Sequence, residues 1–250
     1  MWRFLLPIIV KASKKRQNFS RGNKVELHKI NVEPIIKAKK QECIADPVEV
    51  SSKVIRDIDE VFEVDLQIPV VSGMKDISLQ NRINSRFESD AINFKNETEV
   101  YVNEYVKEAE KNHFPINPCI AKTEYKVHFN KNNILSISVT YYSYTGGAHG
   151  STVIKTTNLN VDKGRILYVR DFFKPSENYE EIILKEIHRQ MEEEQDKYYP
   201  DATEKLKAIP ENQSFYIEDG YIVVYFGQYE IAPYASGIPE FKIPISVMPC

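Results

Sequence analysis

The sequence is poor in the residues and motifs that carry most metal, redox and nucleotide chemistry. Its 250 residues include 3 cysteines, Cys43, Cys119 and Cys250, and none stands at a metal-ligand spacing. An odd count without a Cys-x-x-Cys pair supports no metal site and leaves a Cys43–Cys119 disulfide open. The motifs H-E-x-x-H, G-x-S-x-G and G-x-x-x-x-G-K are also missing. We therefore expect neither a metal nor another cofactor.

A hydrophobic run of membrane-spanning length is missing from the start of the chain. Residues Trp2–Val10 are apolar apart from Arg3, and this stretch is too short to cross a bilayer. Basic residues follow it and no small-residue cleavage site is visible, so it does not read as a clear signal peptide. We expect residues 1–47 to be a basic tail and linker. A membrane-proximal remnant or weak export signal is the alternative.

Charge is distributed unevenly along the chain. Residues 1–40 hold 11 of the 33 Lys and Arg but only 2 of the 36 Asp and Glu. The remainder is therefore acidic, which argues against nucleic acid as the partner and favours a basic one. The basic start of the chain can associate with an anionic membrane surface.

Residues 48–150 are expected to form the first of two α+β halves. Residues 60–69 alternate between apolar and polar side chains, which predicts a strand. Residues 76–111 predict one long helix, because its apolar residues recur at steps of three and four. That apolar stripe consists of Leu79, Ile83, Phe87, Ala91, Phe94, Val102, Tyr105 and Ala109. A hairpin over residues 122–141, with its turn at 130–133, should follow.

Residues 151–250 are expected to form the second half. Strands are predicted at residues 151–161 and 165–169, and a helix should run from an N-cap at Ser176 to Pro200. A hairpin with its turn at Asp219-Gly220 should follow. The three prolines within residues 229–244 predict an edge segment or extended loop there. The fold class is therefore α+β, with two largely antiparallel sheets that are each covered by a long helix.

The densest unusual stretch is Tyr142–Gly150, which joins aromatic residues to three glycines. Glycine supplies positive φ or allows a close approach to the backbone, so we expect Gly146 or Gly147 to have φ > 0. A second aromatic stretch with glycine is Tyr229–Gly237. We expect the two to form one ligand-binding site. Its residues are Tyr142, Tyr144, Gly146, Gly147, His149, Tyr229, Glu230 and Tyr234.

Two residues of this set have side chains suited to catalysis. His149 can act as a general base, and Glu230 lies between aromatic residues in the second stretch. No nucleophile stands at a motif spacing from either residue. Each can equally hydrogen-bond the loop backbone and hold its shape, and for His149 we favour this structural role.

The two long motifs carry a resemblance to a known family. Residues 142–150, Asp171-Phe172-Phe173, residues 229–237 and residues 240–244 resemble the extracytoplasmic domain of RsiV-like anti-sigma factors. They also resemble the non-catalytic N-terminal module of PdaC-type peptidoglycan deacetylases. The resemblance covers about residues 48–247 and implies a cell-surface module of Gram-positive bacteria, which in RsiV-like proteins binds lysozyme. We expect no sigma-binding segment with a membrane span before residue 48, and no deacetylase domain after Val247.

The resemblance thus implies an extracytoplasmic, non-catalytic binding module. Its partner would be a lysozyme-like protein or peptidoglycan. One alternative is a small cell-wall hydrolase that uses His149 and Glu230. Another is a structural domain tethered to anionic lipid by its basic start.

Overall fold

The computed structural model describes residues 47–249. The expected tail, apart from residue 47, lies outside these residues, and so does Cys43. Cys119 is buried with a free thiol, and burial raises the pKa of that thiol. No helix within residues 47–249 is long and apolar enough to cross a membrane.

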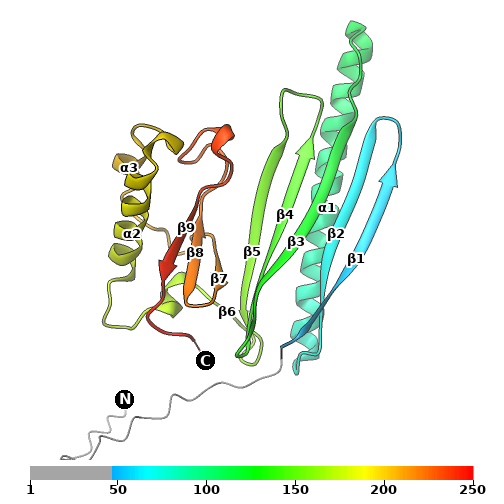
Figure 1. Ribbon diagram of the computed structural model, residues 1–250. Helices are drawn as coiled ribbons and strands as arrows, with labels where there is room; N and C mark the ends of the chain where they lie inside the picture. The colour runs from blue at the N-terminus through cyan, green and yellow to red at the C-terminus, as the bar shows by residue number, and fades with distance from the viewer. Residues whose placement is uncertain (1–46, 250) are drawn as a thin grey trace, which may run out of the picture. The chain divides into compact units, whose positions relative to one another are not determined.

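The fold is α+β, as the sequence predicts, and residues 47–249 contain nine strands in two sheets (Figure 1). The first sheet has the order β1-β2-β3-β4-β5-β6. Its strands are β1 (Glu49–Ile58), β2 (Phe62–Ser72), β3 (Cys119–Lys131), β4 (Ile134–Tyr144), β5 (Ser151–Asn160) and β6 (Arg165–Ile166). Only β2 and β3 pair in parallel, because helix α1 (Ile77–Asn112) connects them.

The second sheet has the order β7-β8-β9. Its strands are β7 (Phe215–Glu218), β8 (Tyr221–Tyr225) and β9 (Glu240–Pro244), and all pair antiparallel. Helix α2 (Tyr179–Glu193) covers it. The short helices η1 (Val169–Phe172), η2 (Gln195–Lys197) and α3 (Ala202–Lys205) precede β7, and η3 (Tyr234–Ser236) lies between β8 and β9. β9 is an edge strand, as the prolines of the closing segment predicted.

Residue 150, the expected division between the two halves, lies in the loop between two strands of the first sheet, β4 and β5. Strand β5 begins at Ser151 and pairs with β4 over ten residue pairs, from Ser143↔Ser151 to Ile134↔Asn160. The first sheet therefore takes in β5 and β6 as well. The chain passes to the second sheet only after Ile166.

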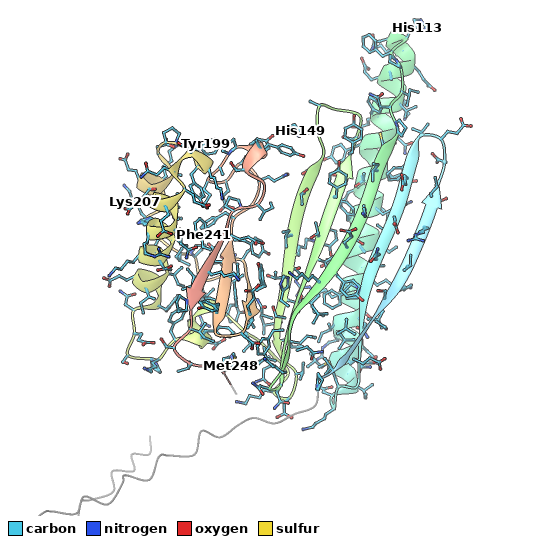
Figure 2. All side chains as sticks on the ribbon, viewed as in Figure 1. His113, His149, Tyr199, Lys207, Phe241 and Met248 are labelled. Carbon is cyan, nitrogen blue, oxygen red and sulfur yellow. The ribbon has the colours of Figure 1, made fainter. Side chains whose placement is uncertain are left out.

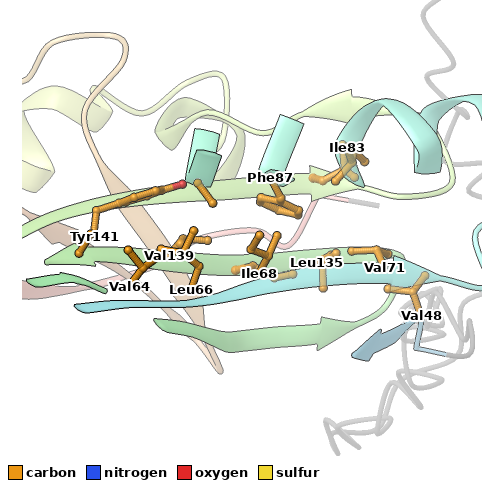
Figure 3. Packing of buried hydrophobic residues seen from close by; sticks show 14 of the residues in the cluster. Val48, Val64, Leu66, Ile68, Val71, Ile83, Phe87, Leu135, Val139 and Tyr141 are labelled. Carbon is orange, nitrogen blue, oxygen red and sulfur yellow. The ribbon is translucent and has the colours of Figure 1, made fainter. Parts of the chain in front are cut away.

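Helix α1 lies across the first sheet on its predicted apolar stripe. Asp76 caps it by accepting a hydrogen bond from the Leu79 backbone N–H at 2.9 Å. Thr98, at the gap in the stripe, is buried and donates to the Phe94 carbonyl at 2.8 Å, so its hydroxyl is satisfied within the helix. Figure 3 shows the packed side chains between helix and sheet.

The prediction for the bounds of α2 is wrong at both ends. The N-cap is Asn178 rather than Ser176, and its side chain accepts from the Glu181 N–H. The helix ends at Glu193 rather than near Pro200. Carboxylates are unfavourable at the negative end of the helix dipole, and the last turn has no basic residue to offset them.

A buried polar network joins the two sheets. Ser136 Oγ donates to Asn158 Oδ1 at 2.7 Å, and Asn158 Nδ2 donates to the Phe215 carbonyl at 2.8 Å. The Ile217 N–H in turn donates to Ser136 Oγ at 3.0 Å. Side chains from β4 and β5 thus satisfy backbone groups of β7 that have no strand partner on that side.

His128 lies beside this network, at an irregularity in the pairing of β3 with β4. Its ring stacks on Tyr216 at 3.8 Å, and Nε2 is 2.8 Å from Ser138 Oγ. Nδ1 is buried without a hydrogen-bond partner. Burial, reinforced by Lys126 and opposed by Glu218, lowers the pKa of His128 from 6.5 to about 4.

We expect this histidine to make the fold sensitive to acid. As pH falls from 6.5 towards 4, the unfolded chain binds a proton that the folded chain does not, so stability falls across that window. Urea titrations at pH 7 and pH 5 should show a loss of about 1 kcal/mol from this group, after allowance for solvent screening. His128→Asn should flatten the pH dependence. An unchanged slope in a folded variant would contradict the assignment.

Candidate functional site

The first motif is a tight loop at the end of β4, and its own side chains shape it. Gly146 has φ +83°, which confirms the expectation of positive φ at this position or at Gly147. Tyr144 donates its hydroxyl to the Gly147 carbonyl at 2.9 Å and so closes the loop on itself. Gly147 is exposed, and a Cβ at that position would meet nothing within 4 Å.

Two of the glycines allow a tyrosine ring to lie against the backbone. A Cβ on Gly146 would lie 2.3 Å from Cζ of Tyr105, and a Cβ on Gly150 would lie 2.4 Å from Cε2 of Tyr142. Tyr105 is in α1, and its hydroxyl accepts from the Asn117 N–H at 2.9 Å. The loop therefore packs against the last third of α1, because Gly146 has no side chain.

The second motif begins with a strained turn after β8. Tyr229 has φ +63°, a conformation that side chains other than glycine rarely adopt. Glu230 holds this turn, since its Oε2 accepts from the Gly227 N–H at 2.7 Å. Strain of this kind persists only where neighbouring contacts hold it, and it gathers at functional sites.

His149, which Figure 2 labels, joins the two motifs through its contacts with Tyr229 and Tyr234. Its Nε2 lies 3.0 Å from the Tyr229 hydroxyl, and its ring stacks on Tyr234 with centroids 4.0 Å apart. Nδ1 lies 3.2 Å from the Gly150 carbonyl. The structure thus brings together residues 80 and 85 positions apart in the sequence, with His149 and Tyr229 exposed and Tyr234 half-buried. We call His149, Tyr229 and Tyr234 the aromatic cluster.

An open cleft of about 510 Å³ lies beside the aromatic cluster. Its walls are the end of β4, the first residues of β5 and the segment after β8. It is lined by Ser143, Thr145, His149, Gly150, Ser151, Thr152, Val153, Ile154, Ser214, Tyr225, Gly227, Gln228, Tyr229, Glu230 and Ile238.

The eight predicted site residues have different places around this cleft. His149, Tyr229 and Glu230 line it, while Tyr234 stacks on His149 and is not part of the lining. The other four, Tyr142, Tyr144, Gly146 and Gly147, shape the loop and do not line the cleft.

Gln228 and the start of β5 also line the cleft, although they are not among the predicted site residues. Gln228 accepts from the Thr152 N–H at 2.9 Å through Oε1, so it attaches the second motif to the edge of the first sheet. Ser151 and Thr152 form part of the cleft wall. No sequence pattern indicates that these residues meet, because the contact spans 76 positions.

The charged and titratable groups do not form a metal site. Within residues 47–249, no three His, Cys, Asp or Glu side chains gather in a geometry that could hold a metal ion. What the arrangement offers is an aromatic surface, hydroxyl and amide groups, and one carboxylate beside an open cavity.

Two family models match successive parts of the chain. The model described as "Deacetylase PdaC" matches residues 55–152, and the model described as "Protein of unknown function (DUF3298)" matches residues 170–246. The first match includes the glycine-rich motif, and the second includes Tyr229–Gly237.

Two curated Bacillus subtilis proteins are similar to the chain. "Anti-sigma-V factor RsiV" is 27% identical over 207 residues, covering 78% of the chain and 67% of RsiV. "Peptidoglycan-N-acetylmuramic acid deacetylase PdaC" is 31% identical over 129 residues, covering 50% of the chain but 27% of PdaC. The chain therefore spans about two thirds of one relative and about a quarter of the other. These matches confirm the resemblance to RsiV and PdaC.

Solved structures show the same fold. A DUF3298 family member from Bacteroides fragilis has a TM-score of 0.61 and 24% identity, covering 82% of this chain and 92% of its own. Another, from Pseudomonas aeruginosa, has a TM-score of 0.54 and 18% identity, covering 80% and 91%. At these identities the likeness concerns the fold alone.

Proposed function

We propose that the chain is a non-catalytic, extracytoplasmic binding domain of the cell envelope, and that its ligand contacts the aromatic cluster and the adjoining cleft. The observation that carries this proposal is the way the two candidate catalytic side chains are engaged. Both His149 nitrogens lie within hydrogen-bonding distance of loop groups, and Glu230 accepts from the Gly227 N–H. Side chains engaged in this way hold two loops in one shape. That shape supports recognition better than proton transfer.

The comparisons support a partner found in the cell envelope. RsiV is named an anti-sigma factor, and the name of PdaC describes action on a peptidoglycan component. A lysozyme-like protein fits the resemblance to RsiV-like sensors and the acidic charge of the chain after residue 40. Peptidoglycan fits the likeness to PdaC.

Calorimetric titration of lysozyme tests the protein partner. We expect the intact chain to bind, and Tyr144→Ala and Tyr234→Ala each to weaken binding about tenfold, because one closes the loop and the other supports His149. Tyr221→Ala is the matched control, since this tyrosine is 41% exposed on β8 and does not line the cleft. If both site variants are folded and bind as tightly as the control, the shared site is wrong.

A parallel pull-down with insoluble peptidoglycan tests the second partner. Retention of the intact chain, and loss of retention in the same two variants, would assign the site to the cell wall. If neither lysozyme nor peptidoglycan binds, the proposed function is wrong.

The second candidate function is a hydrolase that uses His149 and Glu230. The observation in its favour is that both residues line the same open cleft. Release of dye from labelled peptidoglycan tests it, with His149→Ala and Glu230→Gln as the variants. Turnover that disappears in both variants would favour the hydrolase over the binding domain.

A further inference from the structure

The cleft beside the aromatic cluster has the size and the composition of a small-ligand site. Its volume of about 510 Å³ lies within the range of roughly 300–1,000 Å³ that is usual for such sites. Ile154 and Ile238 give it an apolar portion, while Ser143, Ser151 and Ser214 add hydroxyl groups.

The charge of the cleft restricts the class of ligand. Within the described part of the chain, the lining residues include one carboxylate, Glu230, and neither lysine nor arginine. A phosphate, sulfate or carboxylate ligand would therefore meet a like charge with no lysine or arginine in the lining to offset it. The lining favours a ligand without negative charge.

The polar groups of the cleft include both donors and acceptors. Gln228 uses its carbonyl oxygen to accept from Thr152, which leaves the two N–H donors of its amide for another partner. Glu230 binds Gly227 through Oε2, so its other oxygen remains an acceptor. With the serine hydroxyls, these groups suit a ligand that carries several hydroxyl or amide groups.

Tyr229 supplies a fixed aromatic face at the rim. Its side chain is 51% exposed, and its hydroxyl lies 3.0 Å from His149 Nε2. Tyr234 lies beside it, with ring centroids 6.0 Å apart. A ring fixed in this way offers contact area at little cost in conformational entropy.

We infer that the cleft binds a neutral sugar ring of a glycan chain, which stacks on Tyr229 and exchanges hydrogen bonds with Gln228 and Glu230. This inference rests on the proposed function of the chain as a binding domain, and it names the ligand class of the same site. Aromatic stacking, paired donors and acceptors, and a lining without lysine or arginine together favour a sugar over an anion or a purely apolar ligand.

Calorimetry with three tetrasaccharides of different charge tests the inference on the full chain. The probes are tetra-N-acetylchitotetraose, which is neutral, tetragalacturonic acid, which is anionic, and tetraglucosamine, which is cationic. We expect the neutral probe to bind and the anionic probe to bind at least tenfold more weakly. Tighter binding of the cationic probe than of the neutral one would overturn the assignment of a neutral ring.

Substitutions at Tyr229 distinguish a loss of stacking on the sugar from a loss of folding. Tyr229→Ala should weaken the neutral probe at least tenfold, whereas Tyr229→Phe, which keeps the ring, should stay within about threefold of the intact chain. Tyr221→Ala, a tyrosine of similar exposure outside the cleft, should change nothing. If Tyr229→Ala does not fold, Ser151→Trp replaces it in the comparison. Ser151 lines the cleft, so a tryptophan there should fill the cleft and weaken binding of the neutral probe.

The outcomes distinguish this inference from the proposed function. If lysozyme or peptidoglycan binds and the neutral tetrasaccharide does not, the sugar assignment fails and the binding domain stands. If lysozyme, peptidoglycan and the neutral tetrasaccharide all fail to bind, the sugar assignment and the proposed function are both wrong. Binding of the neutral probe that is unaffected by Tyr229→Ala and by Ser151→Trp would place the sugar elsewhere and overturn the inference.

Discussion

Replacing Phe87 by alanine is expected to lower the free energy of unfolding by about 3–5 kcal/mol, as large truncations in a core do. Phe87 is 5% exposed and belongs to the main cluster between α1 and the first sheet. Figure 3 shows it projecting from the helix towards Ile68 and Leu135 of the strands. The truncation removes apolar contacts and leaves a cavity between two rigid layers that cannot close over it.

Glu88 is the matched control for this change. It is the next residue in the same helix, and its side chain is 48% exposed in an ion pair with Lys53. Glu88→Ala should therefore cost no more than about 1 kcal/mol. Urea titration measures both variants, and a loss below about 0.5 kcal/mol for Phe87→Ala would mean that the stripe does not form the core.

Replacing Gly146 by valine is expected to cost about 2–4 kcal/mol, the second largest effect. Two independent constraints act at this position. A β-branched residue is strained at φ +83°, and a Cβ would lie 2.3 Å from the Tyr105 ring. To make room, Tyr105 must move, and its hydrogen bond with the Asn117 N–H is then lost.

Gly147→Val is the matched control within the same loop. Gly147 is not among the residues with positive φ, and a Cβ there meets nothing within 4 Å. Thermal unfolding should show a large drop for the first variant and a small change for the second. Equal destabilisation at both positions would contradict this account.

Tyr105→Ala separates the two contributions to the Gly146 effect, the clash with the tyrosine ring and the backbone strain. In the double variant, the loss should be smaller than the sum of the two single losses, because the truncated side chain no longer obstructs the valine. The strain from φ should remain. Ligand binding should weaken together with stability in Gly146→Val; binding lost at an unchanged melting temperature would place this glycine at a contact surface instead.

Local patterns in the sequence were enough to predict the elements with strong periodicity. The apolar stripe from Leu79 to Ala109 predicted α1 to within one residue at each end, because Asp76 and the Phe114-Pro115 pair mark its bounds. Strand β1 gave no such signal. Its residues are mostly exposed, and its pairing with β2 holds it in place at the edge of the sheet.

Both motifs of the candidate site could likewise be found in the sequence, since aromatic residues beside glycine are conspicuous without any structure. The steric constraint at each glycine is different, and the sequence does not show this difference. Gly146 is constrained by a tyrosine from α1 and Gly150 by one from β4, whereas Gly147 is not constrained at all. The ring at Gly146 comes from α1 and only the fold places it there, whereas the ring at Gly150 belongs to the same motif.

The sequence by itself determined the fold class, the long helix and the two stretches that we propose as the site. Only the tertiary structure decided that His149 stacks on Tyr234 and that Gln228 accepts a hydrogen bond from Thr152. It also decided that residues of both motifs line one cleft. Periodicity and turn preferences depend on a few neighbouring residues, so the local sequence is enough to predict the elements they specify. Contacts across 76 to 85 positions depend on how two sheets pack, and side-chain groups such as those of Ser136 and Asn158 set that packing.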